Sequence, residues 1–246
     1  MAEHSIIHRF GLIGYPLSHS FSPSYFAKKF ADLGIKDSEY LAYELEDIPR
    51  VEALLQSGVK GLNVTIPYKE QVIPYLDRLS DEAKKIGAVN TIKISEEGVV
   101  GYNTDVYGFQ KSLELFLGGK KIEKALVLGS GGAAKAVKFA LETLGILFTT
   151  VSRQASFLQY QDLSKKIIDD HQLVINTTPL GMSPKIHTCP NIPYHLLSDE
   201  HFLYDLVYNP EKTLFLKQGS ARGASVKNGY DMLVLQAEKS WEIWNQ

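Results

Sequence analysis

The feature that most constrains the fold is a strand, a glycine-rich turn and a helix in direct succession near the middle of the chain. Four apolar residues, Ala125 to Leu128, run into Gly129-Ser130-Gly131-Gly132-Ala133-Ala134 and then into a helical pattern. In this G-x-G-x-x-A arrangement the first glycine makes a tight bend, and the second lets the backbone approach a pyrophosphate. Amides at the start of a helix attract phosphate. The segment therefore predicts a dinucleotide-binding turn.

The residues after the next strand indicate which dinucleotide binds. NAD sites usually carry an Asp or Glu there for the ribose 2′-hydroxyl, whereas NADP sites use an arginine for the 2′-phosphate. The chain reads Ser152-Arg153-Gln154, with a hydroxyl and an arginine but no acid. A solvated surface arginine is the alternative interpretation. The position of Arg153 after the second strand favours NADP.

Strand-like apolar runs alternate with helical patterns along the chain, which predicts an α/β fold with mostly parallel sheets. We predict strands at residues 6–13, 61–66, 88–94, 99–102, 124–128, 173–176, 202–206 and 224–226, and one more strand, after the glycine-turn helix, that ends at residue 151. We predict helices from a Ser22-Pro23 start to Gly34, from Thr104-Asp105, from the glycine turn to Leu144, and over 230–244. Residues 118–121, two glycines and two lysines, indicate a boundary between layers or domains.

Composition excludes several classes of function. The formal net charge of −2 gives no basic surface for nucleic acid. No apolar run approaches the roughly 18 residues of a membrane span, and the N-terminus lacks the order of a signal peptide. Cys189 is the single cysteine, and the seven histidines show no metal-ligand spacing. We therefore expect a cytoplasmic protein with a small-molecule substrate, no metal, no nucleic-acid or membrane partner, and a monomeric or homodimeric state.

Several polar residues stand where ligands bind in α/β proteins. Ser18 and Ser20 point the same way in an extended loop after the first strand, and two aligned hydroxyls can hold a carboxylate. Lys69 follows the strand that carries Asn63 and Thr65. Asp105 immediately precedes a predicted helix. Each has an ordinary structural alternative: turn serines, a surface lysine and a helix cap.

Taken together, eight ordered motifs resemble the shikimate dehydrogenase family over nearly the whole chain. Besides the glycine turn they are Ser-x-Ser-x-Ser-Pro (18–23), Asn-Val-Thr-Ile-Pro-x-Lys (63–69), Gly-Ala-Val-Asn-Thr (87–91), Asn-Thr-Asp-x-x-Gly (103–108), Asn-Thr-Thr-Pro-x-Gly-Met (176–182), Tyr-Asn-Pro (208–210) and Met-Leu-Val-x-Gln-Ala (232–237). The resemblance implies NADPH-dependent, reversible reduction of 3-dehydroshikimate to shikimate. The cofactor turn departs from the family's usual Asn-Arg-Thr, and Phe157 stands where another arginine often follows.

The resemblance also implies roles for residues at matching positions. Lys69 and Asp105 would form the catalytic pair, and which of them holds the moving proton stays open. The implied substrate-binding residues are Ser18, Ser20, Asn63, Thr65, Asn90, Tyr208 and Gln236. The implied cofactor-binding residues are Gly129, Ser130, Gly131, Gly132, Ala133, Ser152, Arg153, Asn176, Thr177, Met182 and Gly229.

We expect two α/β units around a cleft. Residues 1–103 would bind the substrate, with the C-terminal helix (229–246) packed back on them, and residues 104–228 would form a Rossmann-type NADP-binding unit. Two alternatives stay open: an NAD-linked quinate/shikimate dehydrogenase, and a non-catalytic ligand sensor on the same fold. Arg153 argues against the first alternative. The presence of both Lys69 and Asp105 argues against the second.

Overall fold

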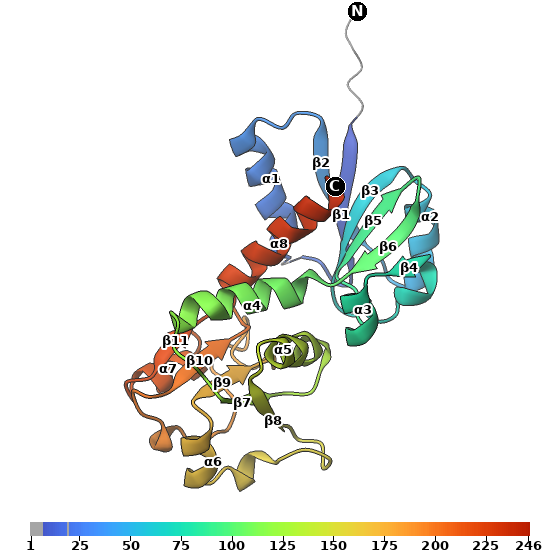
Figure 1. Cartoon of the computed structure of the whole chain (residues 1–246). Coiled ribbons are helices and arrows are strands. Elements are labelled where there is room, and N and C mark those ends of the chain that lie inside the picture. The colour runs from blue at the N-terminus through green and yellow to red at the C-terminus, as the bar shows by residue number, and fades with distance from the viewer. Residues whose placement is uncertain (1–6, 19) are drawn as a thin grey trace, which may run out of the picture. The chain divides into compact units, whose positions relative to one another are not determined.

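The computed structural model describes residues 7–18 and 20–246, and the chain divides into two compact units. The first unit contains the chain up to Thr104 and again from Ala237, and the second contains Asp105–Gln236. Two helices, α4 (Thr104–Leu117) and α8 (Tyr230–Trp244), therefore contribute residues to both units (Figure 1). Residues 118–121, predicted as a boundary between layers or domains, do not separate the two units. They lie inside the second unit, where they connect α4 to the strand Lys124–Leu128.

The first unit is built on a mixed sheet. Its strands are β1 (His8–Gly14), β2 (Ser38–Glu44), β3 (Val59–Val64), β4 (Arg78–Leu79), β5 (Thr91–Ser95) and β6 (Gly98–Tyr102). They lie in the order β2-β1-β3-β5-β6-β4, with β1 parallel to β2 and β3, and β5 antiparallel to β3 and β6. The predicted hairpin is confirmed as β5–β6. The predicted first strand is found at β1, and residue 6 of that prediction lies outside the described residues.

Helices cover both faces of this sheet. They are α1 (Phe21–Leu33), α2 (Val51–Leu55), α3 (Asp81–Ile86) and the last turns of α8. On one face Phe10 stacks on Trp244, with ring centroids 5.0 Å apart, and both pack against Phe26 of α1. The Trp244 indole donates a hydrogen bond to the Ile92 carbonyl at 2.9 Å. On the opposite face the core includes Ile13, Val51, Val72 and Ala83.

The start of α1 differs from the sequence prediction. The helix begins at Phe21, so Ser20 takes the N-cap position that was predicted for Ser22, and Pro23 still lies in the first turn. Proline is favourable there because the first amides of a helix have no intrahelical partner. Gly34 ends the helix as predicted, in a left-handed conformation with φ +65° that glycine adopts without strain.

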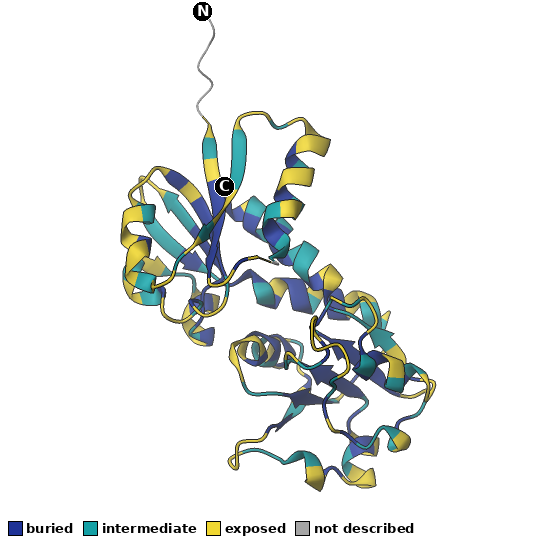
Figure 2. Ribbon diagram, turned by 180° about the vertical axis from the view of Figure 1, so that it is seen from behind, coloured by how far each residue is buried: buried dark blue, intermediate teal, exposed yellow. Residues whose placement is uncertain are grey.

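The second unit is an all-parallel sheet. Its strands are β7 (Lys124–Leu128), β8 (Leu147–Val151), β9 (Leu173–Asn176), β10 (Phe202–Asp205) and β11 (Ser225–Lys227), in the order β11-β10-β9-β7-β8. β9 and β10 are buried along their whole length (Figure 2). From the β8 edge, this is the 2-1-3-4-5 strand order of doubly wound folds. Ligands bind such sheets at the carboxyl ends of strands, where the order reverses, here between β7 and β9.

Two layers of helices cover the parallel sheet (Figure 1). They are α4 and α5 (Gly132–Thr143) on one face, with α6 (Lys165–Asp170) and α7 (Leu214–Ser220) on the other. Short 3-10 helices in the chain are Ile48–Arg50, Ile73–Tyr75, Tyr160–Asp162 and Tyr194–Leu196. Gly108 of α4 lies against α8, because a Cβ there would come within 2.5 Å of the Met232 carbonyl oxygen. Within residues 7–18 and 20–246, no helix is both long and apolar enough to cross a membrane.

α4 begins at Thr104, as the sequence predicted, but the alternative role of Asp105 as a cap ahead of the helix is not found. Thr104 is already the first helical residue, so Asp105 lies in the first turn rather than ahead of the helix. A cap position for Asp105 is therefore wrong. Its carboxylate instead stands where it interacts favourably with the positive end of the helix dipole.

Candidate active site

A cavity of about 590 Å³ lies in the second unit, at the carboxyl ends of β7, β8 and β9. This is the position that the strand order assigns to a ligand. The residues that line the cavity are Gly129, Ser130, Gly131, Ser152, Arg153, Gln154, Tyr160, Thr177, Thr178, Pro179 and Leu180. Six of them belong to the cofactor-binding set expected from the sequence: Gly129, Ser130, Gly131, Ser152, Arg153 and Thr177.

The glycine turn has the shape of a phosphate cradle. Gly129 has φ +111°, and a Cβ there would lie 2.7 Å from the Thr177 hydroxyl, so this position requires glycine. Gly131 is the N-cap residue of α5, and a Cβ at Gly131 or Gly132 would meet no atom within 4 Å. Because the protein itself leaves this space open in front of a helix start, the turn fits a pyrophosphate.

The turn after β8 places a cation at the cavity. Ser152 is buried, and its hydroxyl lies 3.1 Å from that of Ser130 and accepts a hydrogen bond from the Gln154 amide at 3.3 Å. Arg153 is exposed, and its guanidinium forms no ion pair or hydrogen bond with residues 7–18 or 20–246. Among the described residues that line the cavity, Arg153 is the one with a charged side chain. The cavity therefore suits an anionic ligand.

Sequence reasoning missed five lining residues: Gln154, Tyr160, Thr178, Pro179 and Leu180. The last three lie inside the motif of residues 176–182, which could have indicated them. Tyr160 had no such signal, because it comes from a short 3-10 helix after β8. Burial raises the pKa of Tyr160 above its ordinary value, and the positive charge of Arg153, which lines the same cavity, opposes that rise.

Other residues of the expected cofactor set lie away from the cavity wall. Gly132 and Ala133 form the exposed start of α5, and Met182 is exposed. Gly229 has a packing reason to be glycine, since a Cβ there would lie 2.2 Å from the Leu206 carbonyl oxygen. Asn176 is fully buried under the cavity. Direct contact of these residues with a cofactor stays a prediction.

A buried carboxylate lies beside Asn176. Asp205 accepts hydrogen bonds from the Asn176 side chain at 2.9 Å, the Val207 amide at 3.0 Å and the Thr213 hydroxyl at 2.6 Å. Burial raises the pKa of Asp205 to about 6, although all three hydrogen bonds act to lower it. Desolvation of the carboxylate is therefore the dominant effect.

This titration predicts a pH-dependent stability. The folded state holds the Asp205 proton more tightly than the unfolded chain, so the contribution of Asp205 to the free energy of unfolding should fall between about pH 4 and pH 6 and level off above. The shift from 3.8 to about 6 corresponds to ~3 kcal/mol. Asp205→Asn removes the titration, so its stability relative to wild type should rise by up to that amount between pH 4 and pH 7. Urea unfolding at both pH values measures the difference, and an unchanged difference would contradict the assignment.

In the first unit the expected polar residues follow β1 and β3. Ser18 is exposed, and Ser20 occupies the N-cap position of α1 without using its side chain as a cap. Thr65 and Lys69 are half-buried in the segment after β3. The Lys69 carbonyl accepts a hydrogen bond from the Val89 amide at 2.7 Å, which anchors the turn. Because the Ser20 hydroxyl does not cap α1, it can bind a ligand.

Two buried asparagines hold this unit together. The Asn63 side chain accepts a hydrogen bond from the Tyr40 hydroxyl at 2.7 Å and donates one to Ser240 of α8 at 2.9 Å. The Asn90 side chain accepts a hydrogen bond from the Thr104 amide at 2.7 Å and donates one to the Thr104 hydroxyl at 2.9 Å. Asn63 therefore joins β3 to the C-terminal helix, and Asn90 positions the residue that begins α4.

The remaining expected site residues belong to the second unit. Asp105 is half-buried in the first turn of α4. Tyr208 is half-buried, and burial raises the pKa of its hydroxyl. Gln236 is buried and donates a hydrogen bond to the Leu233 carbonyl at 2.9 Å. The predicted catalytic pair thus draws one residue from each unit, and its assembly stays a prediction.

A parallel α/β unit with a phosphate cradle and a neighbouring arginine defines a dinucleotide-binding protein. The shikimate dehydrogenase substrate binding domain matches residues 12–92. The shikimate dehydrogenase (NADP(+)) of Clostridium beijerinckii is 42% identical over 258 residues, covering 96% of this chain and 92% of the relative. The chain belongs to the shikimate dehydrogenase family, as its motifs predicted.

Solved structures agree with this membership. Shikimate 5-dehydrogenase from Thermus thermophilus, in complex with NADP(H) and shikimate, is similar with a TM-score of 0.85 and 33% identity. The match covers 97% of this chain and 93% of that one. Quinate dehydrogenase from Corynebacterium glutamicum, in complex with NAD, is similar with a TM-score of 0.86 and 29% identity, covering 97% and 93%. The two-unit fold is thus common to enzymes with different cofactors.

Proposed function

We propose that the protein catalyses the reversible, NADPH-dependent reduction of 3-dehydroshikimate to shikimate. The 42% identity to a shikimate dehydrogenase (NADP(+)) over nearly the full chain is the observation that carries this function. Arg153, the charged side chain at the cavity of the second unit, supports NADP as the cofactor.

Different residues of the second unit bind different parts of the cofactor. The amides at the start of α5 and the open glycines hold the pyrophosphate, and Arg153 pairs with the 2′-phosphate. When bound, NADPH supplies the hydride that reduces the substrate ketone. Thr177 and Thr178 line the same cavity, in contact with Gly129 of the glycine turn.

Substrate recognition is assigned to polar residues from both units. The hydroxyls of Ser18 and Ser20 bind the substrate carboxylate, and Tyr208 belongs to the same proposed substrate-binding set. Thr65, Asn90 and Gln236 bind ring hydroxyls. Asn63 belongs to the same proposed set, and its buried side chain is hydrogen-bonded to Tyr40 and Ser240.

Lys69 and Asp105 exchange the proton with the substrate oxygen. Reduction of the ketone places negative charge on its oxygen, which needs a proton as the hydride arrives. In the reverse direction a base must take the proton from the hydroxyl. An ammonium and a carboxylate held together can donate and accept that proton, and the residue that carries it stays open.

One assay separates this function from its alternatives. Shikimate-dependent reduction of NADP, repeated with NAD and with quinate, should proceed fastest with shikimate and NADP. A preference for NAD and quinate would assign the chain to the activity named for the C. glutamicum protein. No turnover with any pair would favour a ligand sensor.

Arg153→Ala should weaken the use of NADP and leave NAD nearly unchanged. The lost charged hydrogen bond to the 2′-phosphate is worth about 1–3 kcal/mol, or roughly 5- to 150-fold in kcat/KM. Kinetics with both cofactors measure the effect. Gln154→Ala removes an uncharged neighbour at the same cavity and should not discriminate between them. Equal losses for both cofactors in Arg153→Ala would refute the role.

Changing both Ser18 and Ser20 to Ala should raise the KM for shikimate about tenfold or more, because two hydrogen bonds to a carboxylate are lost. The dissociation constant for NADPH should not change, since its cavity lies in the other unit. Ser24→Ala, an exposed serine of α1, is the matched control and should keep the wild-type KM. If wild type used an analogue without the carboxylate equally well, the assignment would fail.

A further inference from the structure

A buried carboxylate beneath the nucleotide cavity has no part in the mechanism above. Asp205 ends β10, is 0% exposed and pairs in register with Asn176 at the end of β9. Three neutral donors hold it, and no lysine, arginine or histidine among residues 7–18 and 20–246 forms an ion pair with it. Burying a carboxylate without a cation is costly, so a residue of this kind suggests a role beyond packing.

Hydrogen bonds connect Asp205 to the cavity wall. The Asn176 side chain donates to Asp205 through Nδ2, and its Oδ1 accepts from the Thr178 amide at 3.0 Å and the Thr178 hydroxyl at 2.7 Å. The Thr178 hydroxyl in turn accepts from the Leu180 amide at 3.3 Å. Thr178 and Leu180 line the cavity, so the series of bonds runs from the buried carboxylate to the ligand-facing loop.

The same loop adjoins the phosphate cradle. The amide and hydroxyl of Thr177 both donate to the Leu128 carbonyl, at 2.9 and 2.7 Å. A Cβ at Gly129 would lie 3.0 Å from the Thr178 methyl carbon. A displacement of residues 177–180 would therefore change the space between the loop and the glycine turn.

We propose that Asp205 is a positioning residue for the cofactor site: acting through Asn176, it holds residues 177–180 in their ligand-lining conformation before the cofactor binds. This rests on the proposed function in one respect, that the ligand of the cavity is NADPH. Hydrogen bonds to a charged acceptor are stronger than neutral ones. A loop that is ordered in advance spares the ordering entropy on binding, which increases affinity.

Amide hydrogen exchange without cofactor tests the first half of the proposal. In Asp205→Ala the amides of Thr178 and Leu180 should exchange about tenfold faster, because local opening loses the support of a charged hydrogen bond. Exchange in β7 and α5 should stay at the wild-type rate. Ser112→Ala is the control, since it removes another buried hydrogen bond, from the Tyr204 hydroxyl of the same strand, and should leave the loop unchanged. Equal acceleration throughout the second unit would overturn the proposal.

A double-mutant cycle on NADPH binding tests the second half. At pH 8, Asp205→Ala and Asn176→Ala should each raise the dissociation constant about tenfold, and the double variant should show the same factor, not the product. Ser112→Ala should bind as wild type does. A roughly hundredfold effect in the double variant, or a wild-type constant for Asp205→Ala, would mean that Asp205 does not act through Asn176.

If Asp205→Ala does not fold, Asp205→Asn takes its place in the double-mutant cycle. Its amide oxygen can still accept from Asn176, but without charge, so the NADPH dissociation constant should rise about threefold. When Asn176→Ala is already present, Asp205→Asn should not change the NADPH dissociation constant further. An equal rise in wild type and in Asn176→Ala would overturn the proposal. Failure of wild type to bind NADPH would refute the proposed function instead. The exchange experiment would still decide whether Asp205 orders the loop.

Discussion

Lys69→Ala should lower kcat for shikimate oxidation by at least about 100-fold, the usual contribution of a positioned acid–base group. The side chain is half-buried in the turn after β3, while its carbonyl is bonded to the Val89 amide. Substitution therefore removes the amine without removing the bond that anchors the turn. The NADPH dissociation constant should stay at its wild-type value, because the cavity lies in the second unit.

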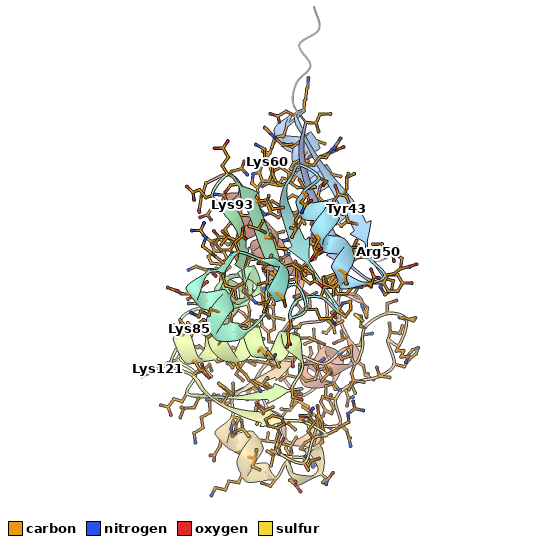
Figure 3. All side chains as sticks on the ribbon, turned by 90° about the vertical axis from the view of Figure 1, so that its right-hand side faces the viewer. Tyr43, Arg50, Lys60, Lys85, Lys93 and Lys121 are labelled. Carbon is orange, nitrogen blue, oxygen red and sulfur yellow. The ribbon has the colours of Figure 1, made fainter. Side chains whose placement is uncertain are left out.

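Lys60→Ala is the matched control for this experiment. Lys60 is an exposed lysine of β3, in the same unit, and its removal should leave kcat unchanged (Figure 3). Steady-state kinetics and a melting curve for both variants separate lost chemistry from lost folding. An unchanged kcat in Lys69→Ala would remove the proposed acid–base centre, and with it the chief argument for an enzyme over a sensor.

Asp105→Asn should also reduce kcat by about 100-fold, because an amide can neither take nor supply the moving proton. Its expected effect on stability is small. Asp105 lies in the first turn of α4, where loss of its charge removes about 0.3–1 kcal/mol of interaction with the helix dipole. Kinetics and urea unfolding on the same samples measure both quantities.

Glu114→Gln is the control for charge removal in the same helix. Glu114 lies later in α4 and forms an ion pair with Lys111 at 2.9 Å, and its removal should leave kcat unchanged. If Asp105→Asn kept full activity and lost only stability, Asp105 would be a structural residue of the helix start. The catalytic pair would then reduce to Lys69 alone.

Local sequence patterns predicted the second unit well. The turn at Gly129, the strand before it and the helix after it appear where the pattern placed them, and α8 spans 230–244 as predicted. Each depends on residues within a few positions of one another, through the periods of strands and helices. β2 and β4 were not predicted. β2 is a half-exposed edge strand without clean alternation, and β4 has two residues, so pairing with neighbours defines both.

In the candidate site, too, some residues could be predicted from local sequence and others only from the structure. The motifs indicated Arg153 and the glycine turn, because a strand end and a helix start mark their positions in the chain. Tyr160 carried no local signal, and contact with the cavity alone reveals it. Asn63 and Asn90 were expected to bind substrate, and the structure adds that they bond to Ser240 and Thr104.

The sequence by itself determined the α/β class, the dinucleotide turn, the arginine that favours NADP and the family, since these depend on short segments and on the order of motifs. Only the tertiary structure decided the strand order 2-1-3-4-5, the division of α4 and α8 between two units, and the burial of Asp205 beside Asn176. Asp205 and Asn176 lie 29 positions apart in the chain. Neither residue's local pattern indicates the other, because the contact arises from the parallel pairing of β9 with β10.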